Sequence, residues 1–145
     1  MSNPGPAVTS TTHPSNLNSQ QALRVIAVQK GVSVAALGDI AVQVNNTSAF
    51  VPVSIVVANA NNAGANADVS SVNLGVYTAK AKGGTAVLTA AALTSQTTQP
   101  YVTVSASSTP NTAETVQTLY VNISVATATA TVDVYVYGYD LSASA

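Results

Sequence analysis

The stretch Thr131–Leu141, "TVDVYVYGYDL", decides the fold, because it is a β-strand pattern that is largely apolar on both faces. Successive side chains of a strand point to opposite sides of the sheet. One side therefore carries Val132, Val134, Val136 and Gly138, and the other carries Asp133, Tyr135, Tyr137 and Tyr139. A sheet at the surface of a small protein usually has one apolar and one polar face. The second apolar face raises the question of what covers it.

The composition indicates a chain with unusually little charge for its apolar content. Of 145 residues, 47% are hydrophobic and 6% are charged, whereas roughly 25% are charged in an average soluble domain. Four Lys and Arg face five Asp and Glu, so the clustered positive charge that binds nucleic acid is missing. We therefore expect no nucleic-acid partner, and we expect much of the surface to be covered by other molecules.

The sequence lacks the features of disulfide-bonded, secreted and membrane-spanning proteins. It has no cysteine, so neither disulfides nor thiolate metal sites are expected. Its first residues have neither the basic nor the apolar region of a signal peptide, and no apolar run approaches the ~18–20 residues of a membrane span. We expect a protein without a membrane partner that is synthesised in a cytoplasm.

The chain divides into an arm, residues 1–20, and a β-sandwich domain, residues 21–145. The arm carries three prolines and the only histidine, which is typical of a flexible or extended segment. The rest alternates β-branched runs with turn residues. It predicts eight strands, near 22–29, 38–45, 50–58, 71–79, 84–91, 100–106, 115–125 and 131–139. This pattern indicates an all-β, antiparallel sandwich, for which a jelly roll is one arrangement. For the segments 18–28 and 85–93, which overlap two of these predicted strands, an α-helix is the alternative prediction.

Two strands give specific predictions of side-chain direction. In 50–58 we expect an inward row of Val51, Val53, Ile55 and Val57, and Pro52 suggests an edge strand or a strand start because it cannot donate a hydrogen bond. In 118–125 the apolar residues Leu119, Val121, Ile123 and Val125 share one face. The polar residues of that strand and Tyr120 share the other.

The sequence offers little chemistry for catalysis. The only histidine, His13, lies in the arm, where a catalytic base would not be held in position. The acids are far apart in sequence, and Asp39, after Gly38, and Asp68, in an Asn-rich loop, are interpreted as turn or cap residues. The Asn-rich loop 59–68 supplies a single carboxylate, too few for a strong calcium site. We therefore predict no enzyme, no catalytic residue, no metal site and no cofactor.

The six tyrosines leave three interpretations open. Exposed rings can stack on sugars, tyrosines can pair across strands within one sheet, or the rings can be buried against another polypeptide. The last is favoured, because aligned tyrosines on a nearly uncharged face would otherwise form an exposed apolar patch.

Residues 35–141 resemble a known protein family in their pattern of short strand-like segments and turns. The segments "SAFVPVSIVVANANNAGANADVSSVNLGVYTAKAKGGTAVL" and "TLYVNISVATATATVDVYVYGYDL" are similar to the head decoration, or cement, proteins of tailed bacteriophages. The shared features are an Asn-bearing loop after "IVVA", "GVYT" before a Gly-Gly turn, "LYVN", and a Tyr-rich last strand.

The resemblance implies a structural protein of the virion, made in the bacterial host and bound to the capsid exterior as a homotrimer that clamps the major capsid protein. On this basis we expect a subunit interface that includes Tyr120, Tyr135, Tyr137 and Tyr139. We also expect a capsid-contacting arm that includes Pro4, Pro6, Val8, His13, Pro14 and Leu17. The alternative is a carbohydrate-binding or adhesive module of a phage fibre or tail.

Overall fold

The structure, a computed structural model, describes residues 23–94, 101–106, 112–127 and 129–142, and all the regular structure in these residues is β-strand. The strands are β1 (Leu23–Ser33), β2 (Gly38–Gln43), β3 (Phe50–Asn62), β4 (Ala65–Asn66), β5 (Asn73–Ala79), β6 (Gly83–Ala92), β7 (Tyr101–Ser105), β8 (Thr118–Val125) and β9 (Thr131–Asp140). The helical alternative was wrong for the described parts of 18–28 and 85–93, which form β1 and β6.

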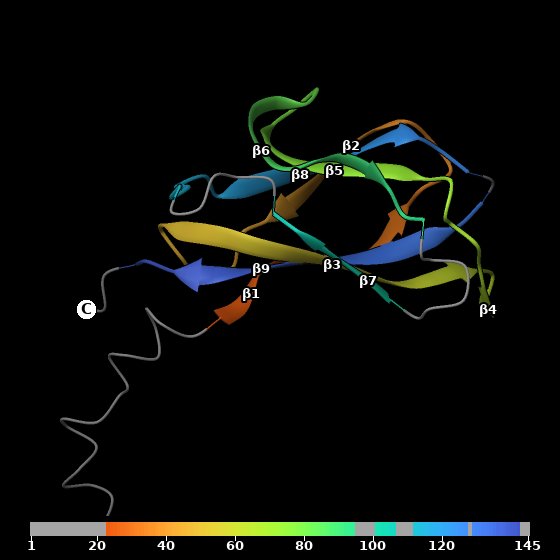
Figure 1. Cartoon of the computed structure of the whole chain (residues 1–145), viewed down its shortest axis with the longest axis horizontal. Coiled ribbons are helices and arrows are strands. Elements are labelled where there is room, and N and C mark those ends of the chain that lie inside the picture. Colours follow the sequence, from red (N-terminus) through yellow and green to blue (C-terminus); the bar gives the residue numbers. More distant parts are fainter. Residues whose placement is uncertain (1–22, 95–100, 107–111, 128, 143–145) are drawn as a thin grey trace, which may run out of the picture.

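The strands form two antiparallel sheets that stack as two layers (Figure 1). In the first sheet the order is β1-β9-β3, and both β4 and β7 pair with β3; in the second it is β2-β8-β5-β6. The predicted all-β, antiparallel sandwich is confirmed. If the two-residue β4 is set aside, the pairs β1–β9, β2–β8, β3–β7 and β5–β6 are nested one inside the next along the chain. The two sheets therefore alternate along most of the sequence.

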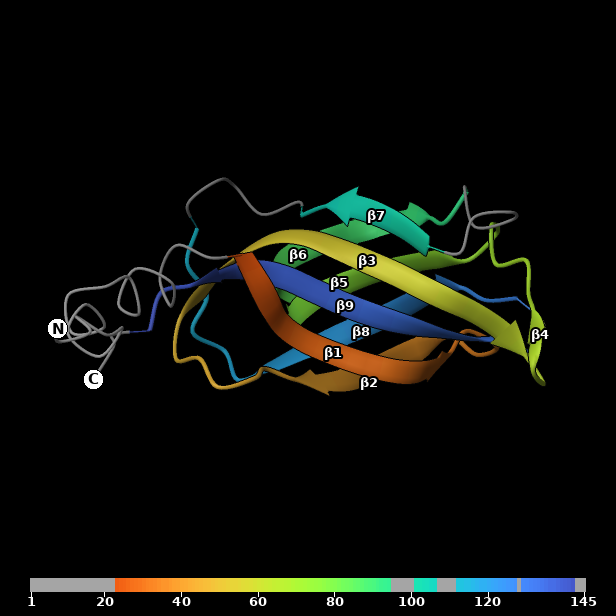
Figure 2. The same cartoon turned by 90° about the horizontal axis from the view of Figure 1, so that it is seen from below.

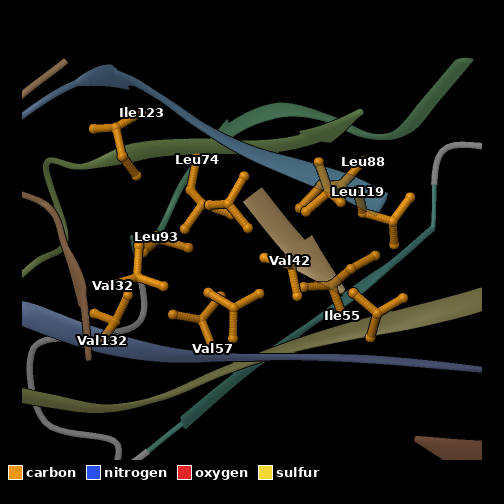
Figure 3. Packing of buried hydrophobic residues seen from close by; sticks show 14 of the residues in the cluster. Val32, Val42, Ile55, Val57, Leu74, Leu88, Leu93, Leu119, Ile123 and Val132 are labelled. Atoms are coloured by element: carbon orange, nitrogen blue, oxygen red, sulfur yellow. The ribbon is translucent and has the colours of Figure 1, made fainter. Parts of the chain in front are cut away.

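The core lies between the two sheets and consists almost entirely of aliphatic side chains from both (Figure 3). Its largest fully buried members include Phe50, Ile55, Leu74, Leu119 and Ile123. The inner row of β9, namely Val132, Val134 and Val136, is at most 1% exposed, as the alternation predicts. Burial of apolar area contributes about 25 cal/mol per Å², so this shared layer provides most of the driving force for folding.

The predicted inward row of β3 was wrong in its first half. Phe50 and Pro52 are buried, while Val51 and Val53 are half-buried and point away from the core. A bulge between Pro52 and Ser54 inserts one residue, so the alternation changes phase there and Ile55 and Val57 face inward as predicted. Pro52 lies near the start of β3, before the pairing with β7 begins at Ser54. β3 itself is not an edge strand, because β9 and β7 flank it.

Gly138 lies at a close approach of β9 and β3. It pairs with Pro52, and a Cβ atom at Gly138 would meet the Val51 carbonyl oxygen and come within 3.1 Å of the Pro52 Cα and the Ile26 Cγ1. A glycine inside a strand often marks such a close approach. The bulge in β3 and Gly138 in β9 lie side by side, and the missing side chain at Gly138 leaves room for the β3 backbone.

We predict that Gly138→Ala lowers the free energy of unfolding by about 1–3 kcal/mol, because the backbone atoms that crowd this site must move apart. Thermal or urea unfolding of the variant measures this directly. Thr131→Ala, at an exposed position of the same strand, serves as the control and should change stability by less than about 0.5 kcal/mol. Equal stability of Gly138→Ala and wild type would contradict the account of this contact.

Candidate functional site

The outer face of the first sheet carries the tyrosines of β9 and forms the candidate site. Directly paired residues of antiparallel strands lie on the same face, so the register identifies its members. Tyr135 lies between Val28 and Val56, and Tyr137 lies between Val25 and Ser54. We call this surface the tyrosine face; its members are Leu23, Val25, Val28, Val51, Ser54, Val56, Tyr101, Thr103, Tyr135, Tyr137 and Tyr139.

No described element covers the tyrosine face. Figure 2 looks onto it, with β1, β9, β3 and β7 side by side and unobstructed. Tyr135 and Tyr137 are half-buried by their cross-strand neighbours, whereas Leu23, Tyr101 and Tyr139 are 50%, 55% and 40% exposed. Tyr135 and Tyr137 thus pack against neighbouring strands, while Leu23, Tyr101 and Tyr139 leave apolar area exposed on the same sheet.

Charge on this side of the molecule lies at its two ends. Asp133 pairs with Ala58 at one end and is buried, and its carboxylate accepts hydrogen bonds from the Gly31 amide at 2.8 Å and from Asn59 Nδ2 at 3.2 Å. Lys30 is exposed in the adjacent bulge of β1. Asp133 belongs to the same outward row of β9 as the tyrosines, and apart from it the named members of the tyrosine face carry no ionisable group except the phenols.

Tyr120 lies elsewhere, on the outer face of the second sheet. It belongs to β8, and Lys80 Nζ lies 5.9 Å from the centroid of its ring, within the range of a cation–π contact. The structure thus brings together three of the four tyrosines expected at a subunit interface and separates the fourth. No flat surface can contain all four.

Tyr77 shows a packing role that sequence analysis missed. Its ring lies over Gly75, where a Cβ atom would come 2.7 Å from the ring carbon Cε2. Its hydroxyl accepts a hydrogen bond from the Ala90 amide at 3.2 Å, and the residue is 5% exposed. The signal is the Gly-x-Tyr spacing within one strand, which places a residue without a side chain beside a ring on the same face.

A polar cluster fastens the β5–β6 turn across the second sheet. The Asp39 carboxylate accepts hydrogen bonds from Asn122 Nδ2 at 2.7 Å and from the Ala81 amide at 2.8 Å. The hydrogen bonds from Asn122 and Ala81 lower the pKa of Asp39; burial opposes them, and the nearby charge of Lys80 adds a smaller lowering. Asn122 is buried, and its Oδ1 has no partner within the described part of the chain. This cluster holds the β5–β6 turn in place.

The other acids also have structural positions. Asp68 accepts a hydrogen bond from the Ser70 amide at 2.9 Å, which confirms the prediction of a turn residue. The backbone of Glu114 pairs with Phe50, next to the start of β3. Among the described residues, no three His, Cys, Asp or Glu side chains come close enough together to hold a metal ion. A shallow depression of about 260 Å³ at the β3–β4 end is lined by Ser, Ala, Asn and Thr, none of which titrates.

A clasp at the opposite end of the sandwich joins the start of β1 to the end of β9. Arg24 Nη1 lies 2.9 Å from Asp140 Oδ2, and Thr47 Oγ1 donates to Asp140 Oδ1 at 2.6 Å. The Ser142 amide donates to the same oxygen at 2.9 Å, and Arg24 Nη2 also donates to the Asn45 carbonyl at 2.6 Å. The start of β1 is therefore held to the end of β9 by a buried carboxylate.

The predicted arm residues Pro4, Pro6, Val8, His13, Pro14 and Leu17 lie outside the described residues. Comparison with family models finds none that matches the chain, and the search of curated proteins finds no match either. Within the part of the chain that the structure describes, there is no helix long and apolar enough to cross a membrane.

We predict that Asp140→Asn lowers the free energy of unfolding by about 1.5–3 kcal/mol at pH 7, the usual range for hydrogen bonds to charged groups. Burial alone raises the pKa of Asp140, but hydrogen bonds from Thr47 and Ser142 and the charge of Arg24 together hold this pKa below its ordinary value. The stabilisation is therefore complete above the ordinary carboxyl pKa of about 3.9, and it is lost as the pH falls through the lower pKa of the folded state.

Denaturant unfolding of both proteins from pH 7 to pH 3 measures this effect. The difference between wild type and Asp140→Asn should shrink below about pH 4. Asp68→Asn removes an exposed carboxylate that holds only a turn, and it should cost much less stability at pH 7. A difference between wild type and Asp140→Asn that stays constant across this range would contradict the role of the clasp.

Proposed function

We propose that this protein is a non-enzymatic structural protein of a virion, which decorates and stabilises the outside of a tailed-phage capsid by bridging major capsid proteins. The observation that carries the proposal is the tyrosine face, a largely apolar sheet surface that no described element covers and that has one buried carboxylate, Asp133, at its end. Contiguous apolar patches of this kind usually mark interaction sites. Tyr is enriched and charge is depleted in the buried centres of protein interfaces.

The strand order supports a finer assignment of the fold as a jelly roll. A jelly roll is a long antiparallel hairpin of eight strands that wraps into two sheets, and the nested pairs β1–β9, β2–β8, β3–β7 and β5–β6 fit that description. Jelly rolls recur in viral capsid proteins and in lectins. A fold does not fix a function, so this likeness supports the virion role by analogy alone.

The positions of the acids support a protein without catalysis. Asp39, Asp68, Asp133 and Asp140 each accept hydrogen bonds from a backbone amide of the chain, and Asp140 is also paired with Arg24. A general acid or base needs to face a bound substrate. These carboxylates instead hold turns, a bulge and the clasp, so we assign them structural roles.

The arm is proposed to provide the attachment to the capsid. Residues 1–20 contain no Lys, Arg, Asp or Glu, so their contacts are expected to be apolar and hydrogen-bonded. β1 follows the arm directly, and Arg24 ties β1 to Asp140 at the end of β9. Force on the arm would therefore pass through the edge strand β1 into β9, a central strand of the first sheet. Many weak contacts of this type on a repeating lattice gain strength through multivalency.

Carbohydrate binding is the second candidate, and the exposure of two rings favours it. Tyr101 and Tyr139 are 55% and 40% exposed, and a flat aromatic ring with a polar end suits stacking on a sugar. A phage fibre or tail module would use the same rings for adhesion. Binding to a glycan array that is lost in both Tyr101→Ala and Tyr139→Ala would favour this candidate over decoration.

Co-sedimentation with purified heads of the phage that encodes the chain tests the proposal. We expect the protein to bind the heads and to saturate at a fixed ratio to the major capsid protein. Because the surfaces involved carry little charge, binding should change little between low and high salt. Absence from virions and no binding to heads would overturn the proposed function, and a steep loss of binding with salt would contradict its apolar character.

Deletion of residues 1–20 tests the role of the arm separately. We expect the truncated protein to keep the unfolding midpoint of the full chain, because the described contacts begin at Leu23, and to bind heads at least tenfold more weakly. Circular dichroism and the same co-sedimentation assay give the two measurements. Undiminished binding by a folded truncated protein would remove the arm from the mechanism.

A further inference from the structure

We propose that the occupant of the tyrosine face is a second copy of this chain, packed face to face about a two-fold axis. The inference deepens the proposed function, because it rests on the same surface and adds the partner and the symmetry. Three properties of the face lead to it: its size, its lack of charge and its difference from the opposite face of the molecule.

The outer face of the whole first sheet is large enough for a stable pair. Four strands, β1, β9, β3 and β7, lie side by side. At about 4.8 Å per strand and about 3.3 Å per residue along β9, this face measures about 20 Å by 30 Å when the end that carries Asp133 is included. Two such faces bury roughly 1,200 Å², the lower end of the range for specific, stable protein interfaces. Stacked sheets pack about 10 Å apart, which leaves room for tyrosine rings from both copies to interdigitate.

The charge of the face selects its partner. Burying an unpaired charge is costly, so the surface opposite Tyr135 and Tyr137 must also be uncharged. The tyrosine face of a second copy meets this condition, because the described charged residues beside it lie at its two ends, Asp133 and Lys30 at one and the Arg24–Asp140 pair at the other. Asp133 is moreover already bonded to Gly31 and Asn59.

The opposite face of the molecule does not meet the same condition. The outer side of the second sheet carries Asp39 and Asn122, and Lys80 lies over Tyr120 there. Stacking the tyrosine face of one copy on this surface of another would bury charged groups against apolar rings. Like faces are therefore the better match, and a contact between identical patches closes at two copies. The trimer implied by the family resemblance would need two different patches on each copy.

Light scattering coupled to size exclusion tests the inference on the full chain. We expect twice the chain mass at micromolar concentration, and Tyr137→Lys should weaken self-association at least tenfold by placing a charge in the buried face. Tyr120→Lys, the matched change on the second sheet, should keep the doubled mass. A single-chain mass at all concentrations, or an unchanged doubled mass for Tyr137→Lys, would overturn the inference.

Cysteine cross-linking gives a second measurement that does not depend on whether Tyr137→Lys folds. The chain has no cysteine, so Ser54→Cys places the only thiol on the tyrosine face, and Thr118→Cys places it on the second sheet. A short bis-maleimide should join two copies of Ser54→Cys and leave Thr118→Cys single. The reverse pattern, or no cross-linking of either variant, would overturn the pairing.

These outcomes are separate from those of the proposed function. A mass of three chains would overturn the two-fold pair and leave capsid decoration standing. A doubled mass that depends on Tyr137, in a protein that does not bind heads, would support the pair and overturn decoration.

Discussion

Strand β9 is hydrogen-bonded to β1 on one side and to β3 on the other, and this double pairing is the constraint on which the rest of the structure depends. It fixes Val132, Val134 and Val136 toward the core and the tyrosines toward the outside. A slip of one residue would exchange the two rows. Gly138 and the bulge of β3 beside it hold the register, because only a residue without a side chain fits there. The tyrosine face is therefore a direct consequence of how the core is built.

The two outer faces of the sandwich differ in their charged groups. This difference shows where a chain with so few charged residues places them. On the second sheet, Asp39 holds the β5–β6 turn and Lys80 lies over Tyr120. The charged groups of this polar surface therefore contact residues of the same chain. On the first sheet, the charge of Asp133 is used at one end to hold the β1 bulge. The remainder of that face has side chains that water solvates poorly. Assembly with another polypeptide is the role that this asymmetry supports.

Local patterns in the sequence were sufficient to predict eight of the nine strands within a few residues. The two-residue β4 was missed, and β1 and β3 extend several residues further than predicted, through bulges that periodicity does not reveal. Val51 and Val53 were predicted to face inward because the alternation was assumed to run unbroken through this segment. The bulge that breaks it lies opposite Gly138, which belongs to a distant strand. Such a contact between remote residues leaves no trace in the alternation of one segment.

The part of the candidate site that lies within one strand was predictable, and the part that depends on contacts between strands was not. Alternation in β9 alone placed Tyr135, Tyr137 and Tyr139 on one face, since neighbouring residues of one strand share a fixed geometry. The sequence did not show that Tyr120 lies on the other sheet, because assigning β8 to that sheet requires the strand order. The clasp between Arg24 and Asp140 joins opposite ends of the sequence and could not be found from spacing.

The central claim is that another polypeptide covers the tyrosine face, and hydroxyl-radical footprinting of the wild-type protein tests it most directly. Oxidation of each tyrosine can be followed by mass spectrometry at rising protein concentration. The account predicts that Tyr137 and Tyr139 become protected as concentration increases, while Tyr120 is oxidised at a constant rate. Equal and constant oxidation of all three, at every concentration and in the presence of phage heads, would contradict it.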